Sequence, residues 1–220
     1  MKEDVLEQLM EDYLHQGGYF TMHNVKYRPD KGCQGYNASR DSVHSDIDIL
    51  AINPKKIGYD RVVAISCKSW QGGFDPSFWI KQIKRKGKIS GRAAWKSFRE
   101  IANDKWASAF RKKIAELTGT KRFTLRIVAT KVTGGNDACS EFEKCGEFRK
   151  RLGRNPIEIR LLSTILHELN KRGAAMKTNT PASSDIGRLL QVIRASGFKL
   201  NEDGKAMPKG KAKPLKNQRK

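Results

Sequence analysis

Two short apolar segments carry charged side chains at matching positions. Residues 46–52 read DIDILAI and begin with Asp46 and Asp48, and residues 61–69 read RVVAISCKS, with Lys68 near their end. Burying an ion among Ile and Val costs several kcal/mol unless an opposite charge or a metal compensates it. The pattern therefore indicates either strand ends whose charges lie in water, or a site in which these charges are compensated.

The charged residues can meet only if the two segments are neighbouring strands. Side chains alternate between the two faces of a strand, so residues 46, 48 and 50 are expected on one face, and Ser66 is expected to share a face with Lys68. A hairpin that turns near residue 57 places Asp48 opposite Ser66, with Lys68 within diagonal reach. We therefore expect a carboxylate, a hydroxyl and an ammonium group at one end of a sheet.

An Asp in an apolar strand, a hairpin, and a second apolar strand ending in x-Lys resemble the PD-(D/E)xK nuclease superfamily. The order of elements over residues 3–132 is also similar to that of archaeal Holliday-junction resolvases and related restriction-type enzymes. The resemblance implies that Asp48 binds a divalent metal, Mg²⁺ or Mn²⁺, and that the backbone carbonyl of Cys67 is a second ligand. It also implies that Lys68 orients or activates the attacking water.

A helix glutamate belongs to the metal site in such relatives. Glu7 lies eleven residues before Gly18 and matches it, although Glu11 lies on nearly the same helix face. Ser66 departs from the pattern, because it stands where the family has Asp or Glu, and a hydroxyl is a poor ligand for Mg²⁺. We expect Ser66 to hydrogen-bond or weakly ligate, with Glu7, Asp46 or Gln71 as sources of the missing oxygen; the alternative is a site that binds DNA without cutting it.

The charge of the chain indicates a polyanionic partner. The 220 residues include 44 Lys and Arg against 23 Asp and Glu, for a net charge of +21. Between Lys81 and Lys113 there are twelve basic residues and two acids, interleaved with Trp and Phe that either stack on bases or, as is usual at helical spacing, pack a core. The residues predicted to contact nucleic acid are Lys84, Arg85, Lys86, Lys88, Arg92, Arg40 and Gln71.

The periodicity of apolar residues predicts an α/β protein with a restriction endonuclease-like mixed central sheet flanked by helices. A nuclease domain is expected over 1–176, a linker and short helix over 177–203, and a basic disordered tail over 204–220. Helices are predicted at 3–16, 76–116, 141–152, 163–171 and 185–196, and strands at 19–27, 46–52, 61–69, 123–132 and 157–162.

Other features narrow the class of protein. No apolar stretch reaches the ~20 residues that span a bilayer, and the acidic first segment, MKEDVLEQLMEDYL, is unlike a signal peptide. No two of the four cysteines have CxxC spacing, so free thiols are expected and a zinc site is disfavoured. We therefore expect a soluble cytoplasmic protein with no membrane partner.

These features together predict a metal-dependent DNA endonuclease that hydrolyses phosphodiester bonds, of restriction or junction-resolving type. The resemblance further implies a homodimer, since double-strand cutting usually needs two sites. Two alternatives remain: a catalytically inactive DNA-binding module on the same fold, and an RNA-associated basic protein.

Overall fold

The computed structural model describes residues 4–175 and 185–196, and its centre is a five-stranded mixed sheet. The strand order is β1-β2-β3-β6-β7; β1, β2 and β3 pair antiparallel, and β3, β6 and β7 pair parallel. The predicted α/β class with a mixed sheet is therefore confirmed, and each predicted strand is present. The strands are β1 Phe20–Tyr27, β2 Ser45–Ile52, β3 Val62–Lys68, β6 Thr124–Ala129 and β7 Ile157–Leu161.

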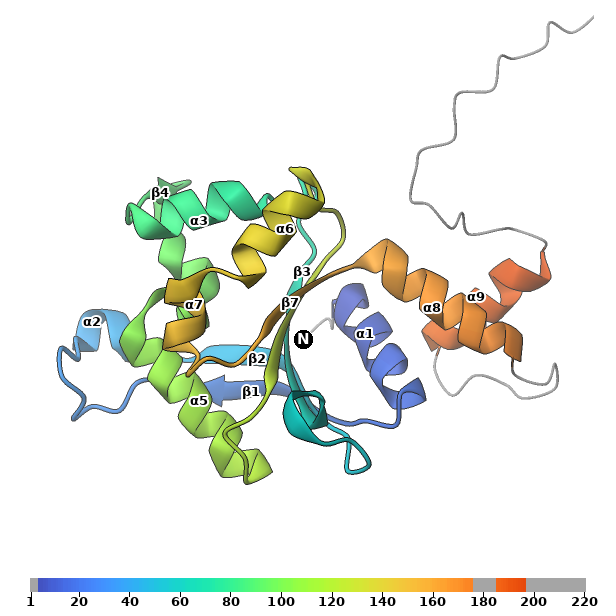
Figure 1. Cartoon of the computed structure of the whole chain (residues 1–220), viewed down its shortest axis with the longest axis horizontal. Helices are drawn as coiled ribbons and strands as arrows, with labels where there is room; N and C mark the ends of the chain where they lie inside the picture. Colours follow the sequence, from blue (N-terminus) through green and yellow to red (C-terminus); the bar gives the residue numbers. More distant parts are fainter. Residues whose placement is uncertain (1–3, 176–184, 197–220) are drawn as a thin grey trace, which may run out of the picture.

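Helices cover both faces of the sheet (Figure 1). One face packs on α1, α8 and α9, and the opposite face packs on the elements between β3 and β7. The helices are α1 Val5–Gln16, α2 Ala38–Asp41, α3 Pro76–Lys84, α4 Arg99–Ala102, α5 Asp104–Thr118, α6 Gly135–Glu143, α7 Gly146–Arg151, α8 Leu162–Ala175 and α9 Asp185–Ala195, with 3-10 turns at Gly58–Arg61 and Ala94–Phe98.

Two predicted helices differ from the structure. The segment 76–116 is interrupted by a small hairpin, β4 Lys88–Ile89 and β5 Arg92–Ala93, because Ser90 and Gly91 both adopt positive φ and turn the chain. The segment 141–152 is two helices, α6 and α7, which meet at Lys144 and Cys145. The predicted helix at 185–196 is present as α9, whereas residues 177–184 of the predicted linker and the tail 204–220 lie outside the described residues.

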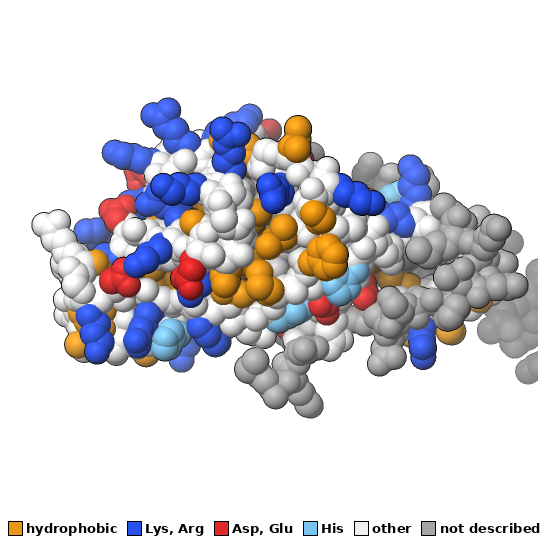
Figure 2. Space-filling model, turned by 90° about the horizontal axis from the view of Figure 1, so that it is seen from below, with side chains coloured by type: hydrophobic (Ala, Val, Ile, Leu, Met, Phe, Trp, Pro, Cys, Tyr) orange, Lys and Arg blue, Asp and Glu red, His pale blue; other side chains and the backbone are white. Residues whose placement is uncertain are grey.

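The outer surface is rich in positive charge. Figure 2 shows Lys and Arg side chains spread over the face seen from below, with fewer Asp and Glu among them. In the described part of the chain, no helix combines the length and the apolar character needed to cross a membrane. All four cysteines are free, as expected.

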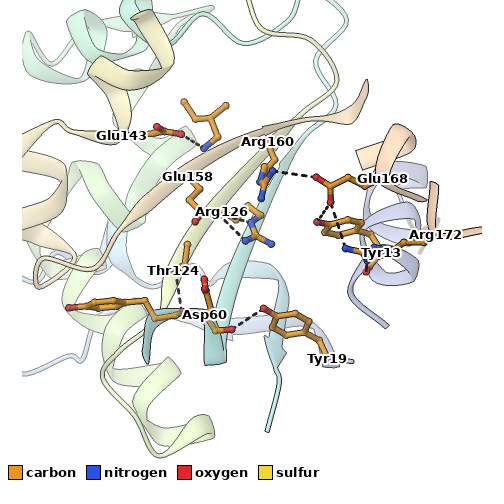
Figure 3. A network of polar contacts seen from close by, with 12 residues as sticks. Tyr13, Tyr19, Asp60, Thr124, Arg126, Glu143, Glu158, Arg160, Glu168 and Arg172 are labelled. Carbon is orange, nitrogen blue, oxygen red and sulfur yellow. Dashed lines mark hydrogen bonds and ion pairs between the residues drawn. The ribbon is translucent and has the colours of Figure 1, made fainter. Parts of the chain in front are cut away.

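A polar network holds α8 against α1 (Figure 3). The Tyr13 hydroxyl of α1 donates to Glu168 Oε2 at 2.5 Å, and Arg172 lies with its guanidinium 4.5 Å from the Tyr13 ring centroid. Arg160 of β7 reaches the same carboxylate at 3.6 Å. These contacts tie the last strand and α8 to α1, and so help to fix α1 against the sheet.

The long segment between β1 and β2 is anchored on α5 by one buried acid. Asp41, which is 1% exposed, accepts hydrogen bonds from Lys105 Nζ, from the Asn37 N–H at 2.8 Å and from Trp106 Nε1 at 3.2 Å. Lys105 Nζ also donates to the Gly35 carbonyl at 2.6 Å. This segment contains little regular structure, and charged hydrogen bonds to α5 hold it in place.

Candidate functional site

The hairpin of β2 and β3 brings Asp48 to the end of β3. The antiparallel register pairs Ile49 with Ile65, so the next positions along the hairpin are Asp48 and Ser66, as the sequence predicted. The Cys67 N–H donates to Asp48 Oδ2 at 2.6 Å. This contact fixes the carboxylate beside the strand that carries Lys68.

The strand β2 is irregular at Asp48. The ladder with β3 ends at Ile49, and the ladder with β1 has no pair at Asp48, where the opposite residue, Asn24, has φ 50°. As a result Ile47 and Leu50 pack into the same core although they are three residues apart. The strict alternation predicted over residues 46–50 is therefore wrong, and this interruption lets Asp48 turn toward the Cys67 N–H.

Lys68 lies on the same side of β3 as the core formed with α3, α4 and α5. Its Nζ is 5.0 Å from the Phe98 ring centroid and 5.8 Å from the Trp70 ring centroid. Burial raises the pKa of Asp48, while the Lys68 ammonium and the Cys67 N–H act in the opposite direction. The Lys68 ammonium thus favours the ionised form of the Asp48 carboxylate.

The N-terminus of α1 brings Glu7 to the site from the other helical layer. Asp4 caps α1 through the Leu6 N–H at 2.9 Å, and its second oxygen accepts from Ser69 Oγ at 2.6 Å. The start of α1 is therefore bound to the residue that follows Lys68. Burial raises the pKa of Glu7, and the negative charges of Asp48 and Asp4 raise it further, which places these carboxylates near one another.

Three residues named as alternatives are engaged elsewhere or exposed. Glu11 Oε1 accepts from His23 Nε2 at 2.7 Å and from Thr21 Oγ1 at 2.9 Å, so this oxygen is engaged by β1. Asp46 pairs with Lys26 at 2.8 Å on the surface. Gln71 is exposed in the turn after β3. Of the two candidate helix glutamates, Glu7 is the one whose pKa is raised, by burial and then by the negative charge of Asp48.

A further carboxylate, Glu100 of α4, was missed by the sequence reasoning. Its side chain is buried, and its Oε1 has no hydrogen-bond partner within the described residues. Burial raises the pKa of Glu100, Lys68 opposes this rise, and Asp48 adds to it. Lys68 and Asp48 thus both act electrostatically on the Glu100 carboxyl group. The position of Glu100 next to Ile101 and two residues after Phe98 was the one signal of burial in the sequence.

The donor atoms present match the chemistry of a hard divalent cation. Among residues 4–175 and 185–196, no group of three His, Cys, Asp or Glu side chains has the arrangement of a metal cluster. The candidate donors are instead two carboxylates, of Asp48 and Glu7, the Cys67 carbonyl and the Ser66 hydroxyl, with Glu100 nearby. All are oxygens, the ligand atoms that Mg²⁺ and Mn²⁺ prefer, and Oε1 of the buried Glu100 has no hydrogen-bond partner within the described residues.

The predicted nucleic-acid contacts lie on the surface. All seven side chains are exposed, and they occupy the end of α3 and the β4–β5 hairpin, α2, and the turn after β3. Most of the interleaved aromatic residues pack the core: Trp79, Phe98, Trp106 and Phe110 are each no more than 8% exposed. Trp95 is the exception, since it is half-buried at the edge of that core.

Comparisons with models of protein families, with curated proteins and with solved structures gave no match to this chain. The function must therefore be inferred from the geometry of the site and from the charge around it.

Proposed function

We propose that the chain is a metal-dependent deoxyribonuclease of restriction endonuclease-like fold, which hydrolyses phosphodiester bonds in DNA. The observation that carries the proposal is the Asp48 carboxylate, fixed on the Cys67 N–H at 2.6 Å, within electrostatic reach of Lys68 and of the acids Glu7 and Glu100. The mixed sheet and the net charge of +21 support it.

Phosphodiester hydrolysis needs charge neutralised on the phosphate oxygens and a hydroxide delivered in line with the leaving group. A bound Mg²⁺ supplies both, because it neutralises charge and lowers the pKa of its water. Asp48, Glu7 and the Cys67 carbonyl would hold that ion. The irregularity of β2 at Asp48 and the capped start of α1 position these donors.

Lys68 is suited to orient the attacking water. Its ammonium lies over the faces of Phe98 and Trp70, which limits the positions it can occupy. The Lys68 ammonium in turn opposes the rise that burial causes in the pKa values of Asp48 and Glu100. In this position Lys68 can donate a hydrogen bond to the water and stabilise the negative charge that develops on the phosphate.

Glu100 can supply the carboxylate that is missing at the position of Ser66. Ser66 provides only a neutral oxygen where a second carboxylate is expected on β3, and Asp46 and Gln71 do not supply it. Glu100 reaches Asp48 and Lys68 from α4 on the adjoining layer. We therefore assign Glu100 the acidic role and leave Ser66 a hydrogen-bonding one.

The exposed cations on α3, the β4–β5 hairpin and α2 are the proposed contacts to DNA phosphates. One chain carries one candidate site, so cutting both strands at one locus calls for two chains. A homodimer is therefore part of the proposal.

Supercoiled plasmid incubated with the protein and Mg²⁺ tests this function directly. We expect nicked and linear products from the wild type, and a fall of at least about a hundredfold in rate for Asp48→Ala and Lys68→Ala. Asp60→Ala and Lys55→Ala are matched controls, because both side chains are exposed and away from the site. The controls should cleave at the wild-type rate.

Three other results would contradict the proposal. Salt-dependent binding of duplex DNA with no cleavage in Mg²⁺ or Mn²⁺ would identify an inactive DNA-binding module. A clear preference for structured RNA over duplex DNA, again without cleavage, would identify an RNA-associated protein. Cleavage that persists in Asp48→Ala would show that the reaction belongs to another site or a contaminant.

A further inference from the structure

A pocket separate from the candidate site lies where α2, the end of α3, the β4–β5 hairpin and the start of α5 meet. Its volume is about 460 Å³, within the range of about 300–1,000 Å³ typical of small-molecule pockets. Figure 1 shows these elements at the end of the molecule opposite α8 and α9. We call it the α2–α5 pocket; its lining includes Asn37, Arg40, Lys84, Lys86, Trp95 and Asn103.

The acids of the α2–α5 pocket are already paired. Asp41 is occupied by Lys105, Asn37 N–H and Trp106, as described above. Glu147 lies 3.8 Å from Arg151, whose guanidinium also donates to Asp104 at 3.0 Å. The carboxylates in the wall therefore serve the fold and are not free to bind a cation.

Among the described residues, five cations line the pocket; Lys105 and Arg151 are held in ion pairs with acids, whereas the other three are not. No ion pair or side-chain hydrogen bond within residues 4–175 and 185–196 engages Arg40, Lys84 or Lys86. Arg40 comes from α2, Lys84 from the end of α3, and Lys86 from the turn that follows, so three separate backbone positions direct positive charge to one hollow. The site therefore favours an anion.

Two asparagines add oriented donors. Asn37 Oδ1 accepts from the Ser39 N–H at 3.0 Å and caps α2, and Asn103 Oδ1 accepts from the Lys105 N–H at 3.2 Å and caps α5. Because the oxygens are used in capping, each amide presents its NH₂ group as the remaining donor. The free polar groups of the pocket are thus donors, and the matching ligand is rich in acceptors.

Trp95 supplies a flat apolar surface in the same hollow. The other three tryptophans pack against another aromatic ring: Trp70 stacks on Trp79 at 5.0 Å, and Trp106 meets Tyr27 at 6.0 Å. No ring contact within the described residues engages Trp95, which is half-buried against the core and lines the pocket. A free indole beside unpaired cations fits a planar group attached to an anion.

We infer that the α2–α5 pocket binds a nucleoside phosphate, with the base on Trp95, the phosphate on Arg40, Lys84 and Lys86, and base acceptors on Asn37 and Asn103. The nucleotide can be free, or it can be one unit of a single strand or an extruded unit of a duplex. This inference does not depend on hydrolysis at Asp48 and Lys68, because none of the pocket residues belongs to that site.

Binding measured by calorimetry on the full chain, without divalent metal, tests the inference. The probes are inorganic phosphate, a nucleoside monophosphate, a ten-nucleotide single strand and the matching duplex. We expect nucleotide probes to bind more tightly than phosphate, Trp95→Ala to weaken them at least about tenfold, and Trp95→Phe to restore most of the affinity. Lys84→Ala with Lys86→Ala should weaken them further, whereas the exposed neighbours Lys81→Ala and Lys96→Ala should not.

The probes also separate the two sources of the nucleotide. A monophosphate that binds as tightly as the strand and is displaced by it supports a pocket for a free nucleotide; a strand that binds far more tightly supports a pocket for one unit of a polynucleotide. Phosphate binding as tightly as the nucleotides would overturn the inference. So would duplex and single-strand binding that Trp95→Ala leaves unchanged. Cleavage plays no part in these readouts, so the outcome stands whether or not the chain is a nuclease.

Discussion

Three carboxylates in the candidate site, those of Asp48, Glu7 and Glu100, have raised pKa values. Burial is the first cause for Asp48, Glu7 and Glu100, and for each of them a neighbouring acid adds to the rise. A raised pKa means that the ionised acid is less favourable in the folded chain than in the unfolded one. These residues therefore reduce stability near neutral pH, which is the expected cost of a site prepared for a cation.

A substitution of Glu100 tests whether one acid both lowers the stability of the fold and supports the proposed cleavage. Glu100→Gln removes the buried negative charge but keeps the shape, so at pH 7 we expect the melting temperature without divalent metal to stay the same or rise. Plasmid cleavage in Mg²⁺ should fall about 10–100-fold, because an acid beside the proposed ion is lost. Thermal melts and cleavage rates measure the two effects on one preparation.

Glu116→Gln is the matched control, since Glu116 is exposed on α5 and pairs only with Lys113. It should change neither cleavage nor melting by a measurable amount. Unaltered cleavage by Glu100→Gln would remove Glu100 from the proposed site. A large fall in melting temperature would show instead that Glu100 is a structural acid.

At the scale of elements, the central hairpin was predictable because its signals are local. The apolar run at residues 62–65 and the turn residues before it set the register that leaves Asp48 opposite Ser66. The β4–β5 hairpin was missed because its strands are two residues each, too short for a periodic signal. Glu100 could not be placed from sequence, because its approach to Lys68 depends on how the crossover after β3 packs on the sheet.

Anchoring of the segment between β1 and β2 gives a prediction at this scale. Burial acts to raise the pKa of Asp41, but the hydrogen bonds from Lys105, the Asn37 N–H and Trp106 outweigh it, so the pKa is lowered. An acid with a lowered folded-state pKa stabilises the fold at pH values above its unfolded pKa of about 3.9. That contribution is lost as the pH falls through the lowered value.

Asp41→Asn should therefore reduce the free energy of unfolding by about 1–3 kcal/mol at pH 7. The difference from wild type should persist at pH 5 and shrink below about pH 4, where the wild-type acid also becomes protonated. Urea unfolding followed by circular dichroism at the three pH values measures it, with exposed Asp60→Asn as the control. A difference that is independent of pH would show that the charge of Asp41 does not hold the segment.

At the scale of the whole molecule, the pKa shifts of the site's acids are opposite in direction to the effect expected from the net positive charge of the chain. A net charge of +21 favours the ionised form of an acid, yet burial and neighbouring acids raise the pKa values of Asp48, Glu7 and Glu100. Local burial and the mutual repulsion of close acids therefore exceed the summed effect of distant Lys and Arg, as expected when water and salt screen long-range charge. Under the proposed function, the surface cations would attract the polyanion and the acids of the site would hold the metal ion.

The stability of the whole chain should consequently respond to divalent metal in a pH-dependent way. Mg²⁺ at about a hundredfold its dissociation constant adds about 2.7 kcal/mol to the folded state, which is about 5–10 °C in melting temperature for a chain of this size. The gain should be larger at pH 7.5 than at pH 5, because protons compete for carboxylates whose pKa values are raised. Sodium chloride at equal ionic strength is the control for screening, and Asp48→Asn with Glu7→Gln should abolish the response. A shift that is equal at both pH values, or that survives in this double variant, would place the bound metal away from Asp48 and Glu7.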